Sequence, residues 1–269
     1  MILEQDIPPG GRLYYGKIAH RKRQIEQISA QIFEEFGFQE IVTPFFSYHQ
    51  REVLASEQLI RVFDRENREV ALRGDSSVDL IRLVLNRLNS STSKWFYIQP
   101  VFRYPSREIY QIGGEWIGGK LEEMVQLNLE IFNRLGIEKI SIVVGQVGIV
   151  EKVQELTPTS RQQLELMELN KLTGWVRRLA EVTKRQQLED LFPTLPPPIR
   201  KEVKKLLQFP VTDCIIAPLL VPQFRYYTGL FYKIIDGKRV YAQGGIYRVK
   251  GVESVGFSIY TDQLLEREF

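Results

Sequence analysis

The stretch REIYQIGGEWIG, residues 107 to 118, carries polar side chains at a spacing that suits ligand binding. Successive side chains of a β-strand point to opposite faces, so Gln111, Gly113 and Glu115 share one face. An amide and a carboxylate then flank a residue that has no side chain. This arrangement suits a binding surface in which Gly113 forms the floor and the two polar side chains form the sides. A solvent-exposed sheet face is the alternative interpretation, and this strand alone leaves both open.

A second candidate binding strand is FRYYTGLFYKI, residues 224 to 234. Alternation places Tyr227 and Gly229 on one face and Tyr226 on the other. A glycine inside a strand of bulky residues usually marks a bulge or the close approach of another group, such as a ligand. We therefore expect Tyr227 to project into a pocket, Gly229 to leave room beside it, and Tyr226 to pack on the reverse face.

Other elements must position these two strands. Apolar residues recur at helical spacing over residues 17–36, and a further short helix is expected near residues 48–55. The strand REVALR (68–73) is followed by Gly74, which turns the chain into a helix, and Asp75 suits the N-cap of that helix. KWFYIQPVFRY (94–104) and the 107–118 strand are separated by a very short turn, which predicts an antiparallel hairpin.

The sheet is split in sequence around a polar, proline-broken helical region. Strands resume with VTDCIIA at residue 211, and a short helix is expected from about Asp262. The pattern predicts an α+β fold in which helices flank an antiparallel sheet. We divide it into a first core part (1–147), a helical insertion (148–208) and a second core part (209–269).

Composition narrows the classes of partner. The net charge of +3, from 36 Lys and Arg against 33 Asp and Glu, is too small to indicate a nucleic-acid partner.

The N-terminus lacks the pattern of a signal peptide and no apolar stretch has the length of a membrane span, so we expect a cytoplasmic protein that does not contact a membrane. The two histidines, His20 and His49, have no partner at metal-ligand spacing. We expect no metal and no cofactor.

Five segments in order, GFQEIVTPFF, VALRGDSS, VFRYPSREIYQIGGEWIG, RYYTGLFYKI and AQGGIYRVKGVESVGFSI, resemble the catalytic core of the class II histidyl-tRNA synthetases. The resemblance spans nearly the whole chain and implies a histidine pocket on the sheet. In that family a glutamate and tyrosines hold the imidazole, while an acid and a hydroxyl meet the ammonium group. Carried over, the histidine contacts fall on Asp75, Ser77, Gln111, Glu115, Tyr226, Tyr227 and Tyr247.

The departures from the synthetases concern ATP. Pro105 stands where the synthetases have a glutamate that meets adenine, and most of the loop that follows is absent. Gln263 and Pro222 occupy positions at which the synthetases have arginines. A neutral amide cannot supply the fixed positive charge that a transferring phosphoryl centre needs. Arg103 remains of the phosphate-binding set, and with Arg107 it is a candidate for anion binding.

A synthetase-like core that keeps the histidine pocket and loses the ATP contacts resembles the ATP phosphoribosyltransferase regulatory subunits. This family resemblance implies a non-catalytic subunit that activates a short-form catalytic subunit in the first step of histidine biosynthesis and mediates feedback by histidine. It also implies a hetero-octamer, self-association through residues 38 to 48, and no anticodon-binding domain or bound tRNA. The effector histidine has two possible places, the old synthetase pocket or the interface with the catalytic subunit.

Two other functions compete with this one. A synthetase-like enzyme that activates histidine or another amino acid would need an ATP site, against which Pro105 and Gln263 argue. A sensor of uncharged tRNA would favour a basic groove, which the sequence does not display.

Overall fold

The computed structural model describes residues 3–88 and 90–267 and centres on an eight-stranded sheet in the order β1-β5-β6-β11-β10-β9-β7-β8. Its strands are β1 (Gln39–Glu40), β5 (Lys94–Arg103), β6 (Arg107–Ile117), β7 (Ser141–Gln146), β8 (Ile215–Ile216), β9 (Tyr227–Asp236), β10 (Arg239–Val249) and β11 (Val252–Tyr260). The long β5–β6 and β9–β10–β11 segments supply most of the sheet surface.

Strand direction follows the expectation in the centre of the sheet and departs from it at the edges. β5 and β6 form the expected antiparallel hairpin, with Gln99 opposite Gln111 and Tyr97 opposite Gly113. The two edge strands, β1 and β8, instead pair in parallel with β5 and β7. The expected strand at VTDCIIA shortens to Ile215–Ile216. The sheet is therefore mixed, with an antiparallel centre.

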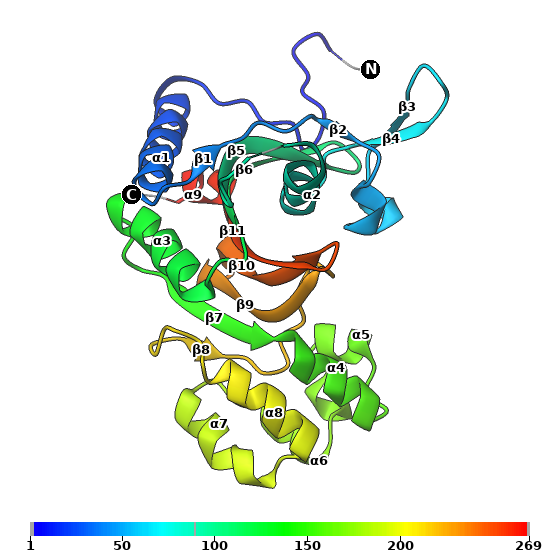
Figure 1. Cartoon of the computed structure of the whole chain (residues 1–269), viewed down its shortest axis with the longest axis vertical. Helices are drawn as coiled ribbons and strands as arrows, with labels where there is room; N and C mark the ends of the chain where they lie inside the picture. The colour runs from blue at the N-terminus through cyan, green and yellow to red at the C-terminus, as the bar shows by residue number, and fades with distance from the viewer. Residues whose placement is uncertain (1–2, 89, 268–269) are drawn as a thin grey trace.

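Helices pack on both faces of the sheet. One face is covered by α1 (Gly16–Glu35), α3 (Leu121–Arg134) and α9 (Thr261–Leu265), while the sheet curves around α2 (Ser77–Arg87) on the other (Figure 1). Gly114 shows how closely α1 packs, because a Cβ added there would lie 2.4 Å from the ring of Phe33. The opposite residues of β6, including Glu115, consequently face α2.

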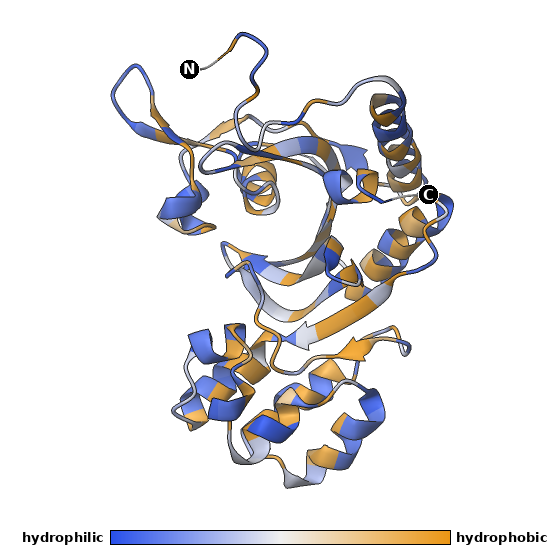
Figure 2. Ribbon diagram, turned by 180° about the vertical axis from the view of Figure 1, so that it is seen from behind, coloured by the Kyte–Doolittle hydropathy of each residue, from blue (hydrophilic) through white to orange (hydrophobic). Residues whose placement is uncertain are grey.

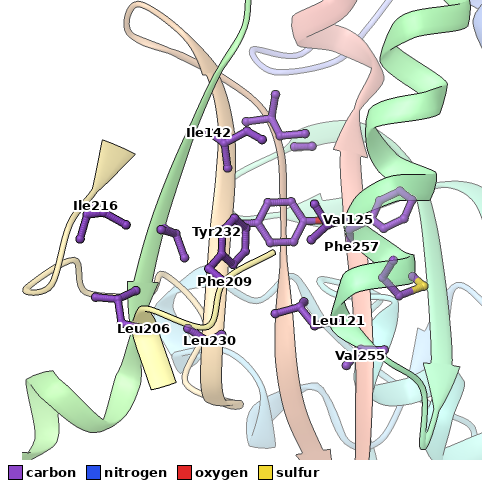
Figure 3. Packing of buried hydrophobic residues seen from close by; sticks show 14 of the residues in the cluster. Leu121, Val125, Ile142, Leu206, Phe209, Ile216, Leu230, Tyr232, Val255 and Phe257 are labelled. Atoms are coloured by element: carbon purple, nitrogen blue, oxygen red, sulfur yellow. The ribbon is translucent and has the colours of Figure 1, made fainter. Parts of the chain in front are cut away.

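A helical segment follows β7 and packs near that end of the sheet. It comprises α4 (Val147–Leu156), α5 (Arg161–Glu165), α6 (Gly174–Ala180), α7 (Arg185–Leu191) and α8 (Pro197–Leu206). Hydrophobic residues run along β7 and β8, where this segment docks (Figure 2). A single buried cluster joins Leu206 of α8 to Tyr232 of β9 and Val125 of α3 (Figure 3). The helical segment therefore shares the core of the sheet.

A second, small sheet precedes α2 in the chain, and of its three strands the sequence predicted only the middle one, at residues 68–73. Its order is β2-β4-β3, formed by β2 (Phe46–Ser47), β4 (Glu69–Leu72) and β3 (Arg61–Phe63). The helix expected near residues 48–55 is only a 3₁₀ turn, Gln50–Glu52. Residues 42 to 48 expose four large apolar side chains: Val42, Phe45, Phe46 and Tyr48.

Arg73 attaches this small sheet to the main one. Its side chain is fully buried and donates hydrogen bonds to the carbonyl oxygens of Thr43 (2.7 Å), Pro44 (3.2 Å) and Pro100 (2.6 Å). Main-chain carbonyls thus satisfy a buried cation without a carboxylate. Among the described residues, no helix is long and apolar enough to cross a membrane.

Candidate ligand-binding site

Glu115 lies at the centre of the candidate site, on the face of β6 that is turned toward α2. One carboxyl oxygen accepts a hydrogen bond from the Ser77 hydroxyl and the other from the Tyr247 hydroxyl at 2.5 Å. The residue is completely buried, and a Cβ added at Gly256 would lie 1.8 Å from its Oε2 atom. Burial raises the pKa of Glu115 to about 8, although the two hydrogen bonds act in the opposite direction.

Asp75 lies in the turn between β4 and α2, and Gln50 fixes this turn. The Gln50 amide oxygen accepts the backbone N–H groups of Gly74 (2.8 Å) and Asp75 (2.9 Å). Asp75 Oδ1 accepts the backbone N–H of Val78 through a long bond of 3.4 Å, and Oδ2 accepts the Tyr226 hydroxyl at 3.3 Å. The carboxylate therefore caps α2 weakly and also faces the tyrosines. Burial raises the pKa of Asp75 to about 6, against the lowering effect of Arg103.

Three tyrosines of the sequence-predicted set lie together. Tyr226 has its ring centroid 5.0 Å from that of Tyr227 and 5.4 Å from that of Tyr247. The expectation that Tyr226 packs on the reverse face is wrong, because its hydroxyl bonds to Asp75. The strand β9 begins only at Tyr227, so strand alternation does not govern the residue before it.

Gly229 accommodates a neighbouring side chain of the protein. A Cβ added there would lie 3.2 Å from the Cβ of Ile246, opposite a register shift between Gly245 and Tyr247. The bulge interpretation is therefore correct, and the expectation that Gly229 leaves room for a ligand beside Tyr227 is wrong. The extra residues of the bulge are on β9, where Thr228, Gly229 and Leu230 oppose the single residue Ile246 of β10, and the Ile246 side chain takes that space.

Tyr97 belongs to the site although sequence reasoning missed it. Its ring lies over Gly113, where an added Cβ would be 2.3 Å from the Cζ atom, and its hydroxyl bonds to Ser258 at 2.8 Å. The floor between Gln111 and Glu115 is thus covered by an aromatic ring. The hairpin register could have revealed it, since Tyr97 pairs with Gly113 and lies on the same face.

Gln111 and Arg103 connect this buried cluster to a cavity. Both line a space of about 230 Å³ at the end of the sheet, together with Arg107. The Gln111 Oε1 atom and the Arg103 Nη1 atom are buried and have no hydrogen-bond partner among the described residues. The site thus contains a buried acceptor and a buried cationic donor that are both unpaired.

The polar side chains of this site are of the kind that suits the binding of a small polar molecule. Asp75, Glu115 and Gln111 present acceptors for N–H donors, and Arg103 presents a cation for an anionic group. Within residues 3–88 and 90–267, no group of three or more His, Cys, Asp or Glu side chains is arranged to hold a metal ion.

Comparison with known proteins places the chain in a family. The family model for histidyl-tRNA synthetase matches residues 16–208. An ATP phosphoribosyltransferase regulatory subunit from Wolinella succinogenes is 35% identical, over 99% of this chain and 97% of the relative. The chain belongs to the family of ATP phosphoribosyltransferase regulatory subunits. A regulatory subunit from Helicobacter hepaticus is 33% identical over 99% of both chains.

Solved structures show that this family member has the histidyl-tRNA synthetase-like class II fold. A protein from Bacillus halodurans, described as an ATP phosphoribosyltransferase regulatory subunit/histidyl-tRNA synthetase, superimposes with a TM-score of 0.83 at 19% identity, covering 99% of this chain and 84% of that one. A histidine–tRNA ligase subunit from Alicyclobacillus acidocaldarius gives 0.80 at 20% identity, covering 98% of this chain and 97% of that one. At 19–20% identity, these similarities show a shared fold and nothing further.

Proposed function

We propose that the chain is the regulatory subunit of ATP phosphoribosyltransferase, required by a short-form catalytic subunit in the first step of histidine biosynthesis. The similarity over almost the whole length of two regulatory subunits carries this proposal. The subunit itself performs no chemistry. Pro105, Pro222 and Gln263, which replace the ATP contacts of the synthetases, support this part of the proposal.

Histidine is the proposed effector, and the buried cluster is its proposed site. The imidazole N–H donates to Glu115, with Tyr227 and Tyr247 beside the ring. The ammonium group donates to Asp75 and to the open Oε1 of Gln111. This assignment gives an acceptor to the imidazole N–H and two acceptors to the ammonium group, which matters because an unpaired buried polar group costs about 1–3 kcal/mol.

The same assignment gives Arg103 and Ser77 a role. Arg103 faces the carboxylate of the ligand, since its Nη1 atom is buried without a hydrogen-bond partner. Ser77 holds Glu115 in place through its hydroxyl. Asp75 and Glu115 are almost completely buried, so histidine enters when Tyr226 moves away from Asp75, to which it is held by a bond of 3.3 Å.

The partners follow the family resemblance. The exposed apolar side chains of residues 42–48 support self-association through this segment, within a hetero-octamer that contains the catalytic subunit. Such a complex would act in the cytoplasm, without tRNA or a membrane. The division into residues 1–147, 148–208 and 209–269 also stays a proposal.

Isothermal titration of histidine into the purified chain tests the proposal, with and without a short-form catalytic subunit. We expect saturable binding that Glu115→Ala weakens roughly tenfold, because the imidazole N–H then loses its buried acceptor, at a cost of about 1–3 kcal/mol. Glu138→Ala, which removes an exposed carboxylate elsewhere, is the matched control. Glu115→Gln keeps the shape of the side chain if the alanine variant does not fold.

Two other outcomes would change the assignment. Binding that requires the catalytic subunit would move the effector to the subunit interface. A parallel titration of ATP with magnesium tests the alternative that the chain is an enzyme. ATP binding together with histidine-dependent pyrophosphate exchange by the chain alone would establish an amino-acid-activating synthetase instead.

A further inference from the structure

The cavity beside the proposed histidine site has an unusual charge. Four cationic side chains line its space of about 230 Å³: Arg12, Arg103, Arg107 and Lys233. Asp262 is the one carboxylate among its lining residues. The cations come from three parts of the chain, the N-terminal segment, the β5–β6 hairpin and β9, which the fold brings to one end of the sheet.

The negative charge of Asp262 is already engaged. Its Oδ1 atom accepts the Tyr14 hydroxyl at 2.6 Å, and its Oδ2 atom accepts the backbone N–H of Tyr110 at 3.0 Å. No cation of the cavity forms a salt bridge to it among residues 3–88 and 90–267. Asp262 therefore holds the sides of the cavity together and interacts electrostatically with Arg12, so a single carboxylate stands against four cations.

Two of the cations have no side-chain partner. The side chains of Lys233 and Arg107 form no hydrogen bond or salt bridge within the described parts of the chain, and Arg103 leaves its buried Nη1 atom unpaired. Burial lowers the pKa of Lys233 and of Arg103, although the Asp75 carboxylate raises the pKa of Arg103. Arg12 approaches only Glu266, at 3.6 Å. Since crowded, partly desolvated cations repel one another, this cavity favours an anion.

The segment before α1 completes the cavity. The Gly10 carbonyl accepts the backbone N–H of Glu108 at 3.0 Å, and the Ser106 hydroxyl donates to the Pro9 carbonyl. Together with the bond from Tyr14 to Asp262, these contacts hold the segment against the end of β6. Arg12 is thereby placed on the wall of the cavity.

We propose that this cavity binds a small phosphate-bearing anion, either a phosphate monoester or a pyrophosphate, in addition to the proposed effector. Several cations call for more than one negative charge, and arginine guanidinium groups bind phosphate oxygens in pairs. The volume is below the roughly 300–1,000 Å³ of sites for drug-sized ligands, which favours a compact anion. Arg103 belongs to the phosphate-binding set of the synthetases and Gln263 replaces one of its arginines, whereas Arg12 and Lys233 are not positions of that set.

Titration of inorganic pyrophosphate, inorganic phosphate and ribose 5-phosphate into the full chain tests this proposal. We expect saturable binding of at least one of them, and the three probes distinguish the two sources of the phosphate group. Lys233→Met should weaken that binding roughly tenfold, because it removes a charge-assisted contact. Lys238→Met, an exposed lysine in the next turn, should leave it unchanged. Arg107→Gln, at an exposed position, replaces the first variant if Lys233→Met does not fold.

Histidine titrations of the same samples keep this proposal separate from the proposed function. Lys233→Met should change the affinity for histidine by less than twofold, since Lys233 is not among the proposed histidine contacts. Failure of histidine binding alone would leave the anion site standing. Absence of binding by all three anions, or binding that Lys233→Met and Arg107→Gln both leave unchanged, would overturn it.

Discussion

The protonation of Glu115 predicts how the stability of the chain depends on pH. Burial raises the pKa of this carboxyl from the usual 4.5 to about 8 in the folded protein. Between these values the folded chain binds more protons than the unfolded chain, so the free energy of unfolding falls as pH rises. Asp75 acts in the same direction at lower pH, since burial raises its pKa from 3.8 to about 6. The interval from pH 6 to 8 therefore reports mainly on Glu115.

The size of the effect follows from the shift. One pKa unit corresponds to about 1.4 kcal/mol, and the slope halves as the pH reaches the folded pKa, so stability should fall by roughly 2 kcal/mol between pH 6 and pH 8. Glu115→Gln removes the titrating group while keeping the shape of the side chain. The variant should show a nearly flat profile over this interval.

Urea unfolding at pH 6, 7 and 8 measures this dependence. The slope of the unfolding free energy against urea concentration should be the same at each pH, so that a change in midpoint reports a change in stability. Glu138→Gln is the matched control, because it removes an exposed carboxyl and should keep the steep profile of the unmodified chain. Equal slopes against pH for the unmodified chain and for Glu115→Gln would refute the reasoning, since the carboxyl would then be ionised in both states.

Two further predictions concern packing. Arg73→Met leaves the carbonyl oxygens of Thr43, Pro44 and Pro100 without their buried donor. The variant should lower the free energy of unfolding, measured by urea unfolding, by about 3 kcal/mol or more. A loss below about 1 kcal/mol would contradict the importance of this hydrogen-bond network. Gly113→Ala brings a methyl group to 2.3 Å from the Tyr97 ring and should cost about 1–3 kcal/mol in a thermal melt, whereas an unchanged melting temperature would show that the ring does not cover this glycine.

Long strands made part of the site predictable from the sequence. Gln111, Gly113 and Glu115 lie on one face as expected, because all three are inside the eleven residues of β6, where alternation is unbroken. The hairpin with β5 was equally clear from its short turn. The resemblance to the synthetases then supplied Asp75 and Ser77, which spacing alone marks only as the start of a helix.

Irregular backbone explains what the sequence could not predict. Tyr226 precedes β9 by one residue and Gly229 lies in a bulge of β9, so counting alternate residues fails at both. The sequence predicted β4 of the small sheet, as REVALR, but β2 and β3 have only two and three residues, which is too short to show a period. The burial of Arg73 has no local signal either, because arginine is normally exposed and its partners here are main-chain carbonyls distant in sequence.

The two short edge strands restrict how the chain can assemble. An exposed sheet edge invites another chain to add a strand, both in β-augmentation and in aggregation. Here β1 and β8 end the sheet after two residues each, and the N–H of Ile216 in β8 is bonded to the carbonyl of Thr183 at 3.0 Å. Neither edge offers a ladder of free backbone groups along β1 or β8. A strand added at β1 or β8 would therefore gain few backbone hydrogen bonds, and point substitutions on the faces and loops can alter assembly while the main sheet stays intact.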